Sequence, residues 1–65
     1  MKVTVNDREV EFEGKTLADL LRHINFGDGG NAIAVGNFII ERSKREEYHL
    51  KEGDIITIIV ATHGG

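Results

Sequence analysis

The sequence lacks cysteine, and it also lacks any apolar run of about 18 residues. Because the sequence contains no cysteine, it cannot form a disulfide or a cysteine-based zinc site, and it has no thiol for redox chemistry. Without a long apolar run these residues exclude a transmembrane helix, and the opening residues MKVTVNDREV lack the apolar centre of a signal peptide. A small domain without disulfides suits a reducing compartment, so we expect a cytoplasmic protein that does not bind membranes.

Positive charge is also scarce. Eight Lys and Arg residues stand against eleven Asp and Glu residues, a net charge of −3, and such a surface disfavours binding to nucleic acid. The length of 65 residues predicts one domain over residues 1–65. A domain this small buries only about 60% of the surface of its unfolded chain, which leaves no room for a deep active site. We expect a monomer when the protein is free.

Two strands joined by a turn are predicted in the first 13 residues. KVTVN alternates, with Val3 and Val5 on one side. EVEFE also alternates, with Val10 and Phe12 on one side. The polar residues NDRE between them are typical of a turn, so the two segments should form a hairpin.

A short helix of about 9–10 residues is predicted next, in TLADLLRHI. Thr16 is typical of an N-cap, and Asp19 suits the positive end of a helix. Asn25 and Gly27 are typical stop signals. The apolar residues recur at the spacing of one helix face: Leu17, Leu20, Leu21 and Ile24.

Three further strands are predicted in AIAV, FII and IITIIVA. The last is apolar on both faces, with Ile56, Ile58 and Val60 on one and Ile55 and Ile59 on the other. Such a strand is typically central in its sheet, and we place it beside the first strand. The order of elements predicts an α+β fold, in which one helix covers one face of a mixed four- to five-stranded sheet.

The face of the sheet opposite the helix should be bare. We expect Ile55 and Ile59 to point to that face, where Phe38 or Ile40 is expected to join them. Exposed apolar clusters often mark protein interfaces, so this surface predicts a partner; the alternative is that loops or Tyr48 cover it. The segment ERSKREE is expected to be a solvated turn, with Tyr48 packed inward. The predicted core consists of Val3, Val5, Val10, Phe12, Leu17, Leu20, Leu21, Ile24, Ile33, Val35, Ile56, Ile58 and Val60.

The polar residues form no recognisable catalytic pattern. His23, His49 and His63 do not have the spacing of metal ligands, and Ser43 lacks the glycines of a nucleophile elbow. The stretch GDGGN lacks the Lys and Ser or Thr that close a phosphate-binding loop. We therefore predict no catalytic residue, no metal and no cofactor, and a protein that is not an enzyme.

The sequence ends in ATHGG, directly after its most apolar run. Glycine is costly to order and packs no side chain, so we expect a flexible tail that is mobile from about Thr62. The carboxylate of Gly65 is a poor electrophile until it is activated, for example as an acyl-adenylate. Two glycines would allow Thr62, His63 and Gly64 to thread into a narrow channel of a partner enzyme. A frayed end without a function is the alternative interpretation.

Several stretches together resemble the ThiS-type sulfur carriers of thiamine biosynthesis, which have a ubiquitin-like β-grasp fold. VNDREVEF resembles the hairpin of that family, TLADLL its helix start, and AIAVGNFIIERSKREEY its paired strands and arginine-bearing turn. KEGDIITIIVATHGG resembles its closing strand and tail. Members of the family often have a proline in the turn that corresponds to Glu41, and this chain has none.

The resemblance implies that an E1-like ATP-dependent enzyme adenylates Gly65. A persulfide sulfur then replaces the adenylate, and the resulting thiocarboxylate donates sulfur to a biosynthetic enzyme such as thiazole synthase. Other acceptors stay open, because the small subunit of molybdopterin synthase and carriers for tRNA thiolation are related. THGG is also similar to the ending of ubiquitin-related modifiers that conjugate to lysines. A plain β-grasp binding module, which uses its sheet and not its tail, is the alternative of another class.

Overall fold

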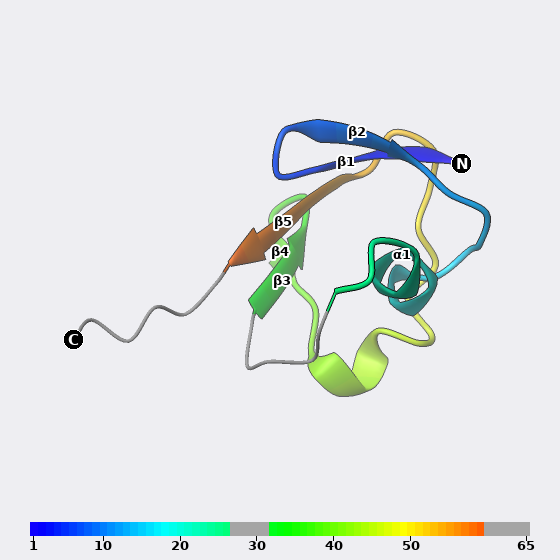
Figure 1. Cartoon of the computed structure of the whole chain (residues 1–65). Coiled ribbons are helices and arrows are strands. Elements are labelled where there is room, and N and C mark those ends of the chain that lie inside the picture. Colours follow the sequence, from blue (N-terminus) through cyan, green and yellow to red (C-terminus); the bar gives the residue numbers. More distant parts are fainter. Residues whose placement is uncertain (27–31, 60–65) are drawn as a thin grey trace.

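The structure, a computed structural model, describes residues 1–26 and 32–59 (Figure 1). The elements are β1 (Lys2–Val5), β2 (Arg8–Glu11), α1 (Leu17–His23), β3 (Ala32–Val35), β4 (Phe38–Ile39), the 3-10 helix η1 (Arg42–Lys44) and β5 (Ile55–Ile59). They form one mixed sheet of five strands in the order β2-β1-β5-β3-β4. Only β1 and β5 pair in parallel; the other pairs are antiparallel. The predicted central position of the last strand, beside the first, is confirmed.

Both hairpins are closed by two-residue turns, and each turn has the backbone geometry that its sequence favours. Asn6 and Asp7 have φ values of 47° and 71°, which short polar side chains tolerate and which a type I′ turn requires. Gly36 has a φ of 60° in the turn from β3 to β4, where a side chain would be strained. These turns fix the register of each hairpin.

The start of α1 is built as the sequence predicted. The Thr16 hydroxyl accepts a hydrogen bond from the Asp19 N–H at 3.1 Å, and the Asp19 carboxylate accepts from the N–H groups of Thr16 at 3.1 Å and Lys15 at 2.9 Å. This is a capping box. Gly14 is needed beside it, because a Cβ there would lie 2.7 Å from the Asp19 Cβ.

The helix is shorter than predicted, with seven residues. Asn25 adopts a φ of 59°, and its N–H donates to the Arg22 carbonyl at 3.1 Å. The Phe26 N–H donates to the Leu21 carbonyl at 2.9 Å. These two bonds form a Schellman motif, so the helix ends at the predicted stop, Asn25, and the difference in length arises because Thr16 and Ile24 are its caps.

The Asp19 carboxylate should make the stability of α1 depend on pH. Its pKa lies well below the ordinary value of 3.8, because the backbone N–H groups of Lys15 and Thr16, and then Arg22, donate to the ionised form. A depressed pKa stabilises the fold above the ordinary value, and this contribution is lost as the pH falls toward the folded-state value. We expect Asp19→Asn to unfold at lower urea than the wild type at neutral pH, and the gap between them to narrow below about pH 4. A gap that is equally wide in acid would contradict this role.

The core lies between α1 and the sheet (Figure 1). Of the predicted core residues, those that are buried are Val3, Val5, Phe12, Leu17, Leu20, Leu21, Ile33, Val35 and Ile56. Val10, Ile24 and Ile58 are only half-buried and pack against this cluster, and Val60 lies outside the described residues. The sequence pattern missed four further buried apolar residues: Ala18, Ala34, Ile40 and Leu50.

The expectation that the segment ERSKREE is solvated is wrong for Arg45. This residue is 7% exposed, and its carbonyl accepts from the Ala18 N–H at 3.0 Å. The chain then follows the start of α1: the Tyr48 carbonyl accepts from Leu17, and the Leu50 N–H donates to Lys15. The segment is therefore tied to the helix by its backbone, which places Arg45 inside and leaves Tyr48 half-buried. Among the described residues, no helix is both long enough and apolar enough to cross a membrane.

Candidate functional site at the end of the central strand

The predicted functional tail follows β5, whose last residue is Ile59. Gly65, the predicted sulfur-carrying residue, lies outside the described residues, as do the predicted threading residues Thr62, His63 and Gly64. Their roles stay predictions. What the structure describes is the strand that holds the tail and the surface around it.

That strand is hydrogen-bonded on both sides almost to its end. The Thr4 N–H donates to the Asp54 carbonyl at 2.9 Å, and the Asn6 N–H donates to Ile56 at 3.0 Å. Beyond the end of β1, the Asn6 side chain continues this pairing: its Oδ1 accepts from the Ile58 N–H at 2.8 Å, and its Nδ2 donates to the Ile58 carbonyl at 3.3 Å. The strand is therefore fixed up to the last residues before the tail.

Sequence reasoning treated Asn6 only as a turn residue. Its partner Ile58 lies 52 positions away along the chain, so no local pattern indicates the contact. The turn geometry at Asn6 and Asp7 directs the amide toward β5, and one residue thus serves both the hairpin and the base of the tail.

The bare face of the sheet carries three large apolar side chains. Ile55 and Ile59 are 59% and 46% exposed, as expected from the alternation of β5. Ile39 is 61% exposed and pairs with Ala34, which pairs in turn with Thr57 of β5. Directly paired residues point to the same face of a sheet, so Ile39 belongs to this surface, and sequence reasoning missed it. We call Ile39, Ile55 and Ile59 the outer apolar face.

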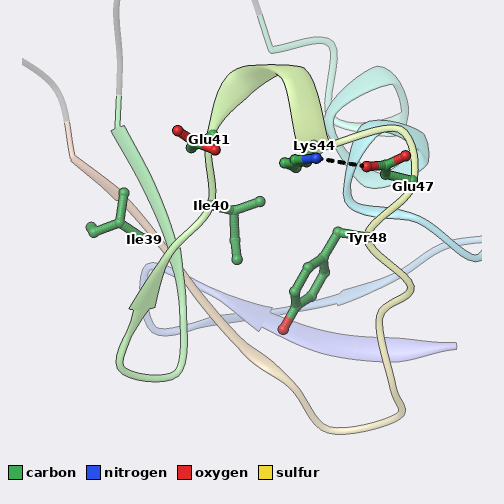
Figure 2. A pocket seen from close by; sticks show the side chains of 6 residues that line it. All are labelled: Ile39, Ile40, Glu41, Lys44, Glu47 and Tyr48. Carbon is green, nitrogen blue, oxygen red and sulfur yellow. Dashed lines mark ion pairs between the residues drawn. The ribbon is translucent and has the colours of Figure 1, made fainter.

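The predicted members Phe38 and Ile40 do not belong to it. Phe38 is 73% exposed, but it pairs with Val35, a core residue on the helix side of the sheet. Ile40 is 9% exposed and belongs to the core. Figure 2 shows the side chains of Ile39 and Ile40 on opposite sides of the chain. The turn between β3 and β4 decides this, since a shift of one residue would exchange the two faces.

Charge divides the outer surface of the sheet. Thr4 pairs with Ile55 on one side and with Glu9 on the other, and Lys2 pairs with Glu11. The apolar half on β5 and β4 therefore borders a polar half on β1 and β2, where Glu9 and Glu11 are exposed. Glu11 is balanced in this half by Lys2, which faces it, and by the N-terminal ammonium group of Met1 at 3.2 Å.

The candidate catalytic residues that the structure describes are not brought together, and His63 lies outside the described residues. His23, at the end of α1, is exposed, and the centre of its ring lies 6.1 Å from the centre of the Phe12 ring. His49 is also exposed, and its backbone forms an isolated β-bridge with Thr16 at the other end of the helix. Ser43 is exposed on η1. Over residues 1–26 and 32–59, no three His, Cys, Asp or Glu side chains are grouped to hold a metal ion.

A mixed sheet of five strands with β5 at its centre and one helix on one face is the ubiquitin-like β-grasp architecture. A crystal structure of a thiamine biosynthesis protein (ThiS) from Geobacter metallireducens superposes with a TM-score of 0.81 at 20% identity, over 100% of both chains. The solution structure of a thiamine biosynthesis protein from the same organism has a TM-score of 0.74 at 20% identity, over 100% of this chain and 88% of that one. At this identity, both show the fold alone.

The family is shown by a direct match. The model of the ThiS family matches residues 2–65, so the chain belongs to the ThiS family, as the sequence resemblance predicted. No curated protein matches the chain. Members of this family are small sulfur carriers of thiamine biosynthesis.

Proposed function

We propose that Gly65 is the residue that carries sulfur. An E1-like enzyme uses ATP to convert its carboxylate into an acyl-adenylate, and pyrophosphate leaves. A persulfide sulfur of the partner then attacks the acyl carbon, AMP leaves, and an acyl disulfide forms. A second thiol of the partner attacks the S–S bond of this intermediate, so that the partner is left with a disulfide and the carrier with a thiocarboxylate. This group, ionised at neutral pH and a soft nucleophile, donates sulfur to thiazole synthase in thiamine biosynthesis. The protein is a cosubstrate here, and the acid–base work belongs to its partners.

The family match carries this proposal, because it extends through both glycines to Gly65. The proposal is tested by measuring the mass of the protein after incubation with its activating enzyme. The hydrogen bonds around β5 add a physical reason. A tail that must reach into another protein is best presented from a fixed base. The Asn6 side chain helps to fix this base, because it is hydrogen-bonded to both the N–H and the carbonyl of Ile58.

We further propose that the activating enzyme docks on the outer apolar face. Ile59 is the last described residue before the tail, so an enzyme that holds the tail must also come close to this side chain. Ile39, Ile55 and Ile59 are large, apolar and between 46% and 61% exposed. Exposed apolar clusters of this kind are typical of protein contacts.

Replacing Ile59 with Asp should reduce adenylation at least about tenfold, because the partner would have to bury an unpaired charge. The fold should survive, since the side chain is already half in solvent. Pyrophosphate release with the activating enzyme measures the effect. Lys51→Asp is the control: it also places an Asp at an exposed side chain, in the turn that precedes β5, and it makes the net charge more negative than Ile59→Asp does. Equal rates for folded Ile59→Asp and the wild type would contradict this docking face.

A further inference from the structure

The two free edges of the sheet differ in character. The β2 edge carries Arg8, Glu9 and Glu11, all exposed. Charged edge residues of this kind protect against pairing with another chain. The β4 edge instead carries Phe38 and Ile39, which are 73% and 61% exposed. An apolar edge without this protection is open to an added strand.

The backbone of β4 directs hydrogen-bonding groups toward the position where an added strand would pair. The Ile40 N–H donates to the Ile33 carbonyl at 2.8 Å. Hydrogen-bonded and non-hydrogen-bonded pairs alternate in an antiparallel ladder, so Ile39, which faces Ala34, directs its N–H and C=O away from β3. Both groups of Ile39 therefore point to the open side of the sheet.

A hollow of about 330 Å³ lies directly beside this edge (Figure 2). Ile40 and Tyr48 supply its apolar part, and Ile39 borders it. The rim is charged: Lys44 forms an ion pair with Glu47 at 3.4 Å, and Glu41 stands on the side of β4. Two carboxylates and one ammonium give the rim a net negative charge. The hollow thus suits an apolar side chain whose neighbours are cationic.

We propose that the β4 edge and this hollow bind an extended segment of a partner protein. The segment pairs with Ile39 through its backbone, places an apolar side chain between Ile40 and Tyr48, and brings a cation to Glu41. A second copy of the chain fits less well. Its own edge, residues 37–41, contains no cation, and each copy has a net charge of −3. This site does not involve the tail, so it goes beyond the proposed sulfur chemistry.

Two synthetic peptides test the site in the intact, isotope-labelled protein. The first is acetyl-Lys-Val-Leu-Val-Lys-amide, and the second replaces both lysines with glutamate. We expect the lysine peptide to shift the amide NMR signals of Ile39, Ile40 and Glu41 saturably, with a Kd of about 1 mM or tighter, and more weakly as salt is added. The glutamate peptide should bind at least about tenfold more weakly. Equal binding of both peptides, or no saturable shift with the lysine peptide, overturns the proposal.

A matched pair of edge variants locates the contact. Ile39→Pro removes the outward N–H, at a position where an edge strand tolerates proline, together with the side chain that borders the hollow, and it should abolish binding of the lysine peptide. Glu9→Pro makes the same change on the β2 edge, where Glu9 likewise faces a non-hydrogen-bonded partner, and should leave binding unchanged. Glu41→Lys, at an exposed side chain, tests the charge if Ile39→Pro does not fold, and should reverse the preference between the peptides. Undiminished binding to folded Ile39→Pro, or an unchanged preference in Glu41→Lys, overturns the site.

Discussion

Incubation of this protein with its activating enzyme, ATP and a sulfur donor should raise its mass by the difference between one sulfur and one oxygen atom. The gain should map to Gly65 by fragmentation of the C-terminal peptide. The physical reason is that a carboxylate reacts with a sulfur nucleophile only after adenylation, and that only a chain end free of side chains can reach deep into a narrow site.

Two tail variants sharpen this test. Gly65→Val should abolish the mass gain, because a branched Cβ would meet the wall of the partner's channel. His63→Ala should matter much less, since adenylation needs no titratable group from the carrier. An unmodified mass with an activating enzyme shown to be active would contradict the sulfur-carrier proposal. A mass gain that corresponds to a lysine-linked target protein would favour a conjugating modifier instead.

Local patterns predicted the elements that local physics controls. The alternation in β1 and β2, the N-cap at Thr16 and the two-sided apolar run of β5 each depend on neighbours within a few residues. Strand order followed from one further step, since a strand that is apolar on both faces is typically central in its sheet; β5 has this central place although its outer face is exposed at Ile55 and Ile59. This is why the central place of β5 could be predicted before any contact was known.

The surface around the tail could be predicted only in part. The exposure of Ile55 and Ile59 follows from the alternation of β5, but the choice between Phe38 and Ile39 depends on the two-residue turn at Gly36. An apolar run such as FII has no alternation of its own, so its register is set entirely by that turn. The sequence pattern therefore placed the wrong neighbour, Phe38, on the outer apolar face.

The contacts of Asn6 and Arg45 were missed for a different reason. Asn6 bonds to Ile58 across 52 positions, and Arg45 is held beside Ala18 by a backbone hydrogen bond. Polarity alone predicts both side chains at the surface, which is right for Asn6 and wrong for Arg45, and it predicts no partner for either. What decides their positions is where the fold brings a distant backbone, and a pattern of single residues does not contain that information.

Truncation of Leu20 to Ala should cost about 2–5 kcal/mol of the free energy of unfolding, because Leu20 is 0% exposed and the deletion leaves a cavity. A domain of this size has only about 3–10 kcal/mol in total. The urea midpoint should fall by about 2 M or more, since the slope for a small domain is about 1 kcal/mol per M. Ile55→Ala is the control: its side chain is 59% exposed, and the loss should stay within about 0.5 kcal/mol.

The same two variants separate stability from docking. Under conditions where it remains folded, Leu20→Ala keeps the outer apolar face intact, so its adenylation rate should be close to that of the wild type. Ile55→Ala keeps the stability but removes part of that face, so its adenylation should slow without any change in the urea midpoint. A loss of less than about 1 kcal/mol in Leu20→Ala would contradict its place at the centre of the core. If both variants slowed adenylation in proportion to lost stability, the effect of Ile55 would belong to folding and not to a partner surface.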